Sequence, residues 1–234
     1  MIAAHIKGSI PNPWNHLTQC GYYHVAYCDK TEILEINDKI GANDEKFRLE
    51  LWPEPFLGNP DAQVYLLNGN PGFTEGKDEK FVYEPVFLKL VLNSMSHKST
   101  QNHDDFLYFN ELKTGGITHP GYEWWMKHTK QLRQVLGRNP RLFNVEFCAY
   151  HSINANHIPE YLPSYDYTDQ LVINAMNENK IIIAMRMVNR WMARIPQLKN
   201  YPNLYRLLNN RNVCLTSGNI VKVTHSFGSV LNAC

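Results

Sequence analysis

The residues best suited to chemistry stand in a short loop that follows an apolar run. The run ends at Leu67 and is followed by Asn-Gly-Asn-Pro-Gly, which indicates a buried strand that ends in a tight turn. The Asn70 amide can orient a water molecule or contact a base edge. Pro71 fixes its own φ, while Gly69 and Gly72 permit positive φ and close approach of a ligand to the backbone. Ligands of open α/β sheets bind beyond the carboxyl ends of the strands, so we expect a ligand here, the alternative being an ordinary turn.

A second group of candidates follows the next predicted strand, at residues 141–150. His151 could donate a hydrogen bond to a base carbonyl or an oxyanion, or be an ordinary loop histidine. Glu146 lies inside the apolar run, where an unpaired carboxylate is costly, so we expect it to form a structural ion pair with Arg186. Arg186 and Arg190 could hold phosphates or belong to a solvated helix face.

The elements that must position these residues alternate between strand and helix. Apolar runs predict strands at residues 63–68, 141–150, 181–185 and 204–208. Helical spacing of apolar residues predicts helices at residues 84–94, 123–136, 168–177 and 188–194. We expect Thr168 at the N-cap of the third helix. This alternation indicates a parallel, doubly wound sheet. Residues 1–50 look irregular and are expected to form an N-terminal extension packed on an α/β domain that spans residues 51–234.

Composition narrows the class of protein. The chain has 234 residues, 44% of them hydrophobic and 19% charged, which is typical of a globular protein. Its 23 Lys and Arg nearly balance its 22 Asp and Glu, which argues against a protein held to nucleic acid mainly by bulk charge. The five cysteines form no Cys-x-x-Cys pair and are expected to be free thiols. The sequence shows neither a signal peptide nor an apolar run of ~18 residues, so we expect a cytoplasmic protein.

No sequence pattern indicates a cofactor. Neither the dinucleotide-binding glycine motif nor the P-loop motif follows a predicted strand. His103, Asp104 and Asp105 come closest to a metal-binding group, but three adjacent polar residues in a loop are usually solvated. We therefore predict no metal and no cofactor. Trp124 and Trp125 fall within a predicted helix and are expected in the core.

The first loop and the strand order resemble the uracil-DNA glycosylase superfamily. Its first motif ends the first core strand and reads GQDPYH in the uracil-specific branch and GMNPG in the mismatch-directed branch. The stretch Gly69-Asn70-Pro71-Gly72 matches the end of the second form, with Asn68 in place of the leading Gly. The resemblance implies a three-layer α/β/α fold with a short central parallel sheet. It also implies that Asn70 positions water against the anomeric carbon of the sugar, while the turn backbone approaches the base.

The second motif of that family is not matched. It follows the last core strand and reads HPSPLS or NPSGLS, and its first residue contacts the base carbonyl. The corresponding place here is the loop at residues 209–212, or the stretch 216–219, and neither contains a Pro-Ser pair. By position, the resemblance assigns substrate contacts to Asn209, Asn210 and Arg211. A base-reading Asn at the end of the second core strand has as candidates here Tyr150, His151, Ser152 and Asn154.

The resemblance implies hydrolysis of the N-glycosidic bond of a base in DNA, with the base flipped into a pocket. Asn70 and His151 are the predicted catalytic residues, and Phe73 and Tyr83 are candidates for stacking on the base. Gly72 stands where the uracil-specific branch has a Tyr that blocks the thymine methyl, which implies a wider pocket. The expected partner is DNA or a nucleobase or nucleotide ligand. The alternatives are a non-catalytic nucleobase, nucleotide or nucleic-acid binding protein of the same fold, and an unrelated doubly wound hydrolase.

Overall fold

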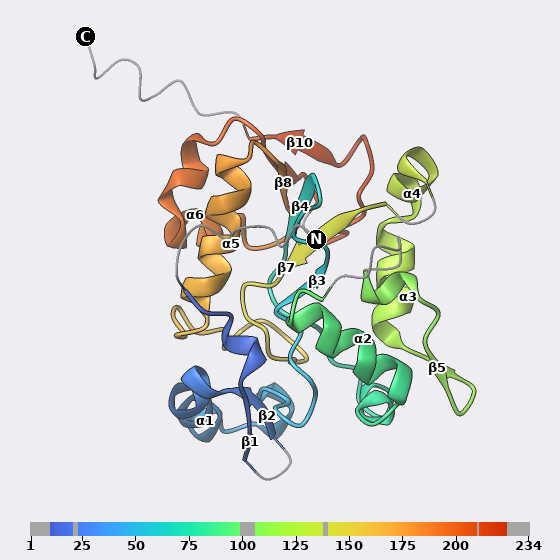
Figure 1. The fold of residues 1–234 in the computed structure, drawn as a ribbon, viewed down its shortest axis with the longest axis vertical. Helices are drawn as coiled ribbons and strands as arrows, with labels where there is room; N and C mark the ends of the chain where they lie inside the picture. Colours follow the sequence, from blue (N-terminus) through green and yellow to red (C-terminus); the bar gives the residue numbers. More distant parts are fainter. Residues whose placement is uncertain (1–9, 21–22, 99–105, 138–139, 210, 224–234) are drawn as a thin grey trace.

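The centre of the protein is a six-stranded sheet with helices on both sides (Figure 1). The computed structural model describes residues 10–20, 23–98, 106–137, 140–209 and 211–223. The strand order is β10-β9-β8-β4-β7-β3. Four of these strands run parallel to one another: β7 Leu142–Val145, β4 Val64–Leu67, β8 Ile181–Ala184 and β9 Leu204–Leu207. They are the four strands expected from the apolar runs, and β4, at the centre, is buried along most of its length.

The sheet is mixed and not purely parallel, which corrects the expectation. Two three-residue strands, β3 Phe56–Gly58 and β10 Ile220–Lys222, pair antiparallel at its two edges, with β7 and β9. Edge strands of this length carry too few residues for an apolar period to be visible in the sequence. The antiparallel direction of β3 matters for the site, because the residues that precede it lie at the carboxyl end of β7.

The helices form two groups, one on each side of the sheet (Figure 1). The helices α5 Tyr165–Asn177 and α6 Val188–Arg194 lie on one side, and α2 Pro85–Met95, α3 Pro120–His128 and α4 Lys130–Leu136 on the other. The expected helix 123–136 is two helices, because the chain is capped at Thr129, whose hydroxyl donates to the Trp125 carbonyl at 2.6 Å. Helix α5 begins earlier than predicted, after Ser164, so Thr168 lies in its first turn and is not the N-cap.

The N-terminal region is more regular than the sequence suggests. It contains the hairpin β1 Leu17–Cys20 and β2 Tyr23–Ala26 and the helix α1 Lys30–Lys39. The Tyr150 hydroxyl donates to Asp29 Oδ2 at 2.9 Å and accepts from the Ala26 amide at 3.2 Å. The Ser164 amide donates to Asp29 Oδ1 at 2.8 Å. These buried bonds hold the N-terminal region against the loops that follow β7.

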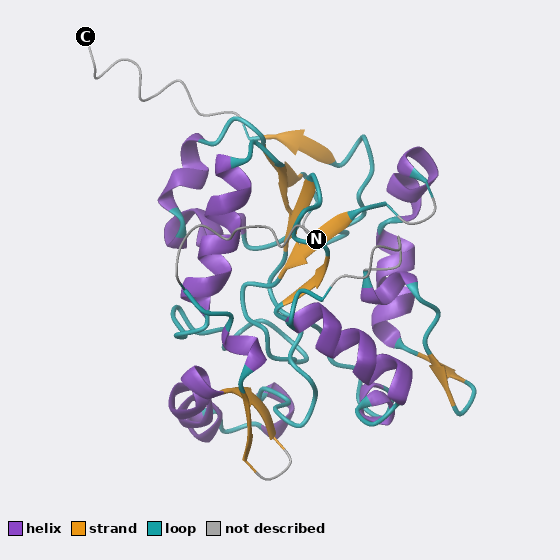
Figure 2. Cartoon of the chain, viewed as in Figure 1, coloured by secondary structure: helices purple, strands orange, loops and turns teal. Residues whose placement is uncertain are grey.

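The remaining elements are short. A second hairpin pairs β5 Lys113–Thr114 with β6 Ile117–Thr118. Six 3-10 helices complete the described secondary structure: η1 Pro13–Asn15, η2 Tyr27–Asp29, η3 Asn43–Glu45, η4 Asp78–Phe81, η5 Leu107–Phe109 and η6 Pro196–Asn200. The long loops that join these pieces to the sheet are shown in teal in Figure 2, and several of them meet at the carboxyl ends of the central strands.

Candidate functional site

A cavity of about 330 Å³ opens at the carboxyl ends of the central strands. Asn68 and Asn70 enter its wall after β4, Glu146 after β7 and Arg186 after β8. Glu54 joins them because it precedes β3, which runs antiparallel to β7. The position of the cavity agrees with the general rule that ligands of open α/β sheets bind beyond the carboxyl ends of the strands.

The Asn70 side chain is held in one orientation. Its Nδ2 lies 2.8 Å from Ser152 Oγ, 3.1 Å from the Pro71 carbonyl and 3.4 Å from the Tyr150 carbonyl. Carbonyl oxygens only accept, so the nitrogen must face them. The Ser152 hydroxyl donates to the Asn154 carbonyl and therefore accepts from Asn70. No described residue bonds to Asn70 Oδ1, which remains available to accept from a water molecule or a ligand.

Three buried carboxyl groups line the same cavity: Glu54, Asp78 and Glu146. Burial raises the pKa of Glu54 to about 7, that of Asp78 to about 6 and that of Glu146 to about 8. The Tyr108 hydroxyl donates to Glu54 Oε1, and the Thr74 amide donates to Asp78 Oδ2 at 2.6 Å. These are groups that gain and lose protons near neutral pH, as general acids and bases must.

Glu146 does not form the expected ion pair with Arg186. Its Oε1 accepts from Asn144 Nδ2 at 2.8 Å, and Asn144 Oδ1 accepts in turn from Asn68 Nδ2 at 3.0 Å. The charge of Arg186 lowers the pKa of Glu146, against the larger effect of burial. Glu146 Oε2 and Asn68 Oδ1 are buried without a hydrogen-bond partner among the described residues.

The two arginines near the end of β8 differ in their surroundings. Arg186 lines the cavity and is exposed. Arg190 instead donates to the carbonyls of Ile158 at 3.0 Å and Pro159 at 2.8 Å, and pairs with Glu160 at 3.1 Å. Of this pair, Arg186 is therefore the one placed to contact an anionic group of a ligand.

His151 also lines the cavity, but its nitrogens face the backbone. Nδ1 lies 2.7 Å from the Gly72 carbonyl, and Nε2 lies 3.0 Å from the Trp52 carbonyl and 3.5 Å from Glu54 Oε1. Burial lowers the pKa of His151, while the Gly72 carbonyl and the Asp78 carboxylate raise it. These contacts join the Gly72 turn to the segment before β3, so we assign His151 a positioning role.

Aromatic rings and a neutral histidine complete the wall. His119 Nδ1 accepts from the Gly121 amide at 3.0 Å, so Nε2 carries the hydrogen and faces Asp78 Oδ1 at 3.9 Å. Burial lowers the pKa of His119 to about 3. Trp124 and Phe73 line the cavity and are only partly buried, so they can offer flat apolar faces to a ligand.

Some of the site residues predicted from the sequence line the cavity, and others lie outside it. The cavity brings together Asn70, Pro71, Gly72, Phe73 and His151. Trp124 and Trp125, expected in the core, also reach its wall, although Trp125 is buried.

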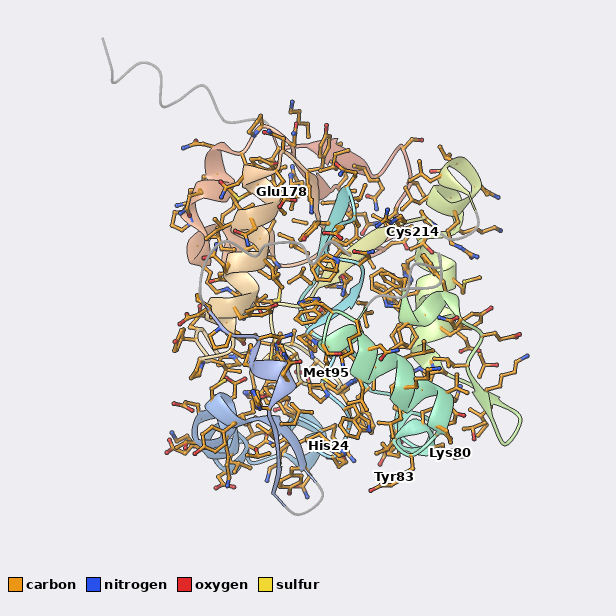
Figure 3. All side chains as sticks on the ribbon, viewed as in Figure 1. His24, Lys80, Tyr83, Met95, Glu178 and Cys214 are labelled. Carbon is orange, nitrogen blue, oxygen red and sulfur yellow. The ribbon has the colours of Figure 1, made fainter. Side chains whose placement is uncertain are left out.

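Two other predicted site residues, Gly69 and Tyr83, lie outside the cavity wall. A Cβ on Gly69 would come within 2.8 Å of Met187 Sδ, so this glycine allows close packing. Neither Gly69 nor Gly72 has positive φ, so the expectation that these glycines are needed for a left-handed backbone conformation is wrong. Tyr83 is 74% exposed and lies at the outer edge of the molecule (Figure 3).

The described residues of the loop after β9 do not contribute to the cavity wall. Asn209 and Arg211 are exposed, and Asn209 Oδ1 accepts from the amides of Arg211 and Asn212, both at 3.0 Å. Asn209 therefore closes its own turn. Asn210 lies outside the described residues, as do His103, Asp104 and Asp105.

Two findings concern cofactors and membranes. Among the described residues, no group of His, Cys, Asp and Glu has an arrangement that could hold a metal ion. No helix in the described ranges combines the length and apolar character needed to cross a membrane.

Comparisons with protein-family models, with curated proteins and with solved structures find no match to this chain.

Proposed function

We propose that the protein hydrolyses the N-glycosidic bond of a base in DNA, in the manner of the uracil-DNA glycosylases that its first loop resembles. The observation that carries this proposal is the Asn70 side chain. Its nitrogen is committed to Ser152 and to two carbonyls, and its oxygen is free to accept a hydrogen bond at the carboxyl end of the central strand. An oxygen held in this way can fix the orientation of an attacking water molecule.

Proton transfer falls to the buried carboxyl groups. An amide is not a base, so Asn70 can orient water but cannot take its proton. Glu54 and Asp78 line the same cavity and have pKa values of about 7 and about 6, so each is partly ionised near neutral pH. In the proposed step the water oxygen bonds to the anomeric carbon, its proton passes to one of these carboxylates, and the base leaves with the electrons of the carbon–nitrogen bond.

The cavity also suits a flat ring. Its volume of about 330 Å³ lies at the lower end of the range of small-molecule sites. Phe73 and Trp124 supply apolar faces, and the Arg48 guanidinium lies 4.3 Å from the centre of the Phe73 ring. A base of duplex DNA would have to leave the stack to enter such a cavity.

A labelled oligonucleotide that contains one uracil tests the proposal, both single-stranded and paired with guanine or adenine. We expect abasic product from the parent protein and a loss of about 10²-fold in rate in Asn70→Ala, the order of magnitude found when one positioned group of an active site is removed. Asn209→Ala is the matched control, because it removes an exposed asparagine side chain outside the cavity. The proposal fails if no substrate gives more abasic product with the parent than with Asn70→Ala.

A binding protein without turnover is the second candidate. Asn209 and Arg211, to which the resemblance assigns base contact, lie outside the cavity wall, and Asn209 Oδ1 accepts hydrogen bonds within its own turn. Binding to duplex DNA through several phosphates should weaken steeply with salt. Binding of a nucleoside that is insensitive to salt, without cleavage, would favour this second candidate.

A further inference from the structure

Both ring nitrogens of the buried His151 side chain face backbone carbonyl oxygens. Nδ1 lies 2.7 Å from the Gly72 carbonyl, and Nε2 lies 3.0 Å from the Trp52 carbonyl, so both pairs are at hydrogen-bonding distance. A carbonyl oxygen only accepts, so each nitrogen must carry a hydrogen to make its bond. A neutral imidazole has one ring hydrogen, whereas an imidazolium has two.

A neutral His151 ring would leave one of these contacts unfavourable. With its hydrogen on Nδ1, the lone pair of Nε2 would point at the Trp52 carbonyl, and with its hydrogen on Nε2, the lone pair of Nδ1 would point at the Gly72 carbonyl. Turning the ring over would place carbons at both carbonyls and lose both bonds. The imidazolium is therefore the form of His151 that satisfies both contacts.

The Glu54 carboxyl group supplies the negative charge that such a buried cation requires. Its Oε1 lies 3.5 Å from His151 Nε2 and accepts from the Tyr108 hydroxyl. Backbone bonds fix this arrangement, because the Glu54 amide donates to the Ala149 carbonyl and the Arg48 amide donates to the His151 carbonyl, both at 2.9 Å. Glu54 Oε2 is bonded by no described residue, and Glu54 lines the cavity. The carboxylate thus has one oxygen held by donors and one left for the ligand.

We propose that His151 is an imidazolium at neutral pH and that its charge keeps Glu54 ionised, which makes Glu54 the base of the reaction. His151 is then a positioning residue that acts through Glu54. This assignment rests on the proposed function and chooses Glu54 over Asp78. As the water oxygen bonds to the anomeric carbon, its proton passes to Glu54 Oε2, and the base leaves with the electron pair of the carbon–nitrogen bond.

The charged groups around His151 act in opposite directions on its pKa. Burial lowers the pKa and is the largest single effect, while the two carbonyls and the carboxylates of Asp78 and Glu50 raise it. The nearby Arg48 guanidinium is paired with Glu50 at 2.6 Å. Ionised Glu54, at 3.5 Å, adds to the raising effects, so the cation and the carboxylate form together as a coupled pair.

The other titratable groups that face the pair are neutral. Burial and the charge of His151 lower the pKa of His119 to about 3, so His119 carries no charge at neutral pH. Burial and the Glu54 carboxylate raise the pKa of Tyr108 well above its usual value and that of Glu146 to about 8. Neither group therefore competes with Glu54 for the charge of His151.

Ring ¹⁵N NMR of the histidine-labelled protein tests the charge of His151 without any turnover. We expect both ring nitrogens to have nearly the same shift at about pH 7, as in an imidazolium, whereas a neutral ring gives two widely separated shifts. In Glu54→Gln, which cannot ionise, the two shifts should separate at the same pH. His157 is the internal control, because its Nε2 lies 2.9 Å from Glu45 Oε2 on side chains that are 37% and 35% exposed, outside the cavity. Its signals should not change in Glu54→Gln.

The pH profile of oligonucleotide cleavage tests the role of the pair in the reaction. Burial and the Tyr108 bond set the Glu54 pKa at about 7, at which value the ionised fraction rises about tenfold from about pH 6 to pH 8. We expect His151→Gln to show this tenfold rise in rate, and the parent and the control His157→Gln to change by less than about threefold. Glu54→Gln should lose at least about 10²-fold in rate, and Asp78→Asn less than about tenfold.

Separated ring shifts of His151 in the parent, or an imidazolium that persists in Glu54→Gln, would overturn the ion pair. Equal pH profiles of the parent and His151→Gln, or a larger loss in Asp78→Asn than in Glu54→Gln, would overturn the choice of Glu54 as the base. The spectrum of the parent needs no variant, so it decides the charge of His151 even where a variant fails to fold.

Failure of the proposed reaction is a separate outcome. An imidazolium that depends on Glu54, without cleavage of any uracil oligonucleotide, rejects only the hydrolysis. Cleavage by a protein in which His151 is neutral rejects only the ion pair.

Discussion

Two asparagine-rich loops follow parallel strands of this sheet, and they differ in where their polar atoms go. In the loop after β4, Asn68 and Asn70 both line the cavity, and Asn70 Oδ1 has no hydrogen-bond partner among the described residues. In the loop after β9, Asn209 Oδ1 accepts two backbone amides, and Asn219 donates to the carbonyls of Asn212 at 3.0 Å and Cys214 at 2.9 Å. The first loop keeps bonding capacity for a ligand, and the second uses its own to close a turn.

The position of each strand explains this difference. Strand β4 has parallel neighbours on both sides, so loops from β7, β8 and the segment before β3 all meet its carboxyl end. Strand β9 lies next to the antiparallel edge strand β10, and the chain that joins them folds back locally. Asparagine content alone does not separate the two loops; the number of neighbouring strand ends does.

The largest difference should appear when a central asparagine is removed. Asn144→Leu deprives Asn68 Nδ2 and Glu146 Oε1 of their partner, and each buried polar atom left unpaired costs about 1–3 kcal/mol. We therefore expect the free energy of unfolding in urea to fall by about 2–5 kcal/mol. Asn212→Leu, an exposed residue of the second loop, should change it by less than about 0.5 kcal/mol. Similar losses in both variants would remove the energetic distinction between the loops.

The pH dependence of stability should also distinguish the central site. The folded-state pKa of Glu146 is raised from 4.5 to about 8, so its contribution to stability is complete below the unfolded value and is lost as the pH rises through about 8. Between about pH 5.5 and pH 8 this predicts a loss on the order of 2–3 kcal/mol. Urea unfolding of Glu146→Gln should show a smaller decline over the same interval. Identical slopes for the parent and the variant would contradict the raised pKa.

Much of the framework around this site could be predicted from the sequence. Apolar runs identified all four parallel strands, and the Asn-Pro-Gly turn, for which a ligand was predicted, lies in the cavity wall. The edge strands β3 and β10 were missed because three residues show no period. The break at Thr129 was missed because it depends on a side-chain bond to the Trp125 carbonyl.

Most of the titratable residues of the cavity could not be predicted from the sequence. Glu54, Asp78, Tyr108 and His119 come from four separate loops or 3-10 turns, and tertiary packing alone brings them together. Only Glu54, which stands between two prolines before a strand, carried a local signal. Glu146 was noticed as a carboxylate in an apolar run, but its hydrogen-bond partner is an asparagine two residues away and not the expected arginine.

A smaller effect is expected from widening or narrowing the pocket at Gly72. No atom lies within 4 Å of a Cβ built at this residue, and its φ is not positive, so a side chain is tolerated by the backbone. Because glycine presents no wall to a 5-methyl group, the parent should discriminate poorly between uracil and thymine. Gly72→Tyr should raise the preference for uracil by about 1 kcal/mol, or roughly fivefold. An unchanged ratio of the two affinities in the folded variant would argue against Gly72 lying beside the base.

The smallest effect is expected at Asn209, and it sharpens the comparison most directly. The family resemblance assigns this residue to base contact, whereas its Oδ1 accepts the amides of Arg211 and Asn212 in an exposed turn. Loss of such a local cap costs about 1 kcal/mol or less. We therefore expect Asn209→Ala to lower the melting temperature slightly and to leave cleavage of the uracil oligonucleotide within about twofold of the parent. A loss of activity or binding comparable to that of Asn70→Ala, in a protein that melts like the parent, would mean that the loop after β9 closes over the cavity when a ligand binds.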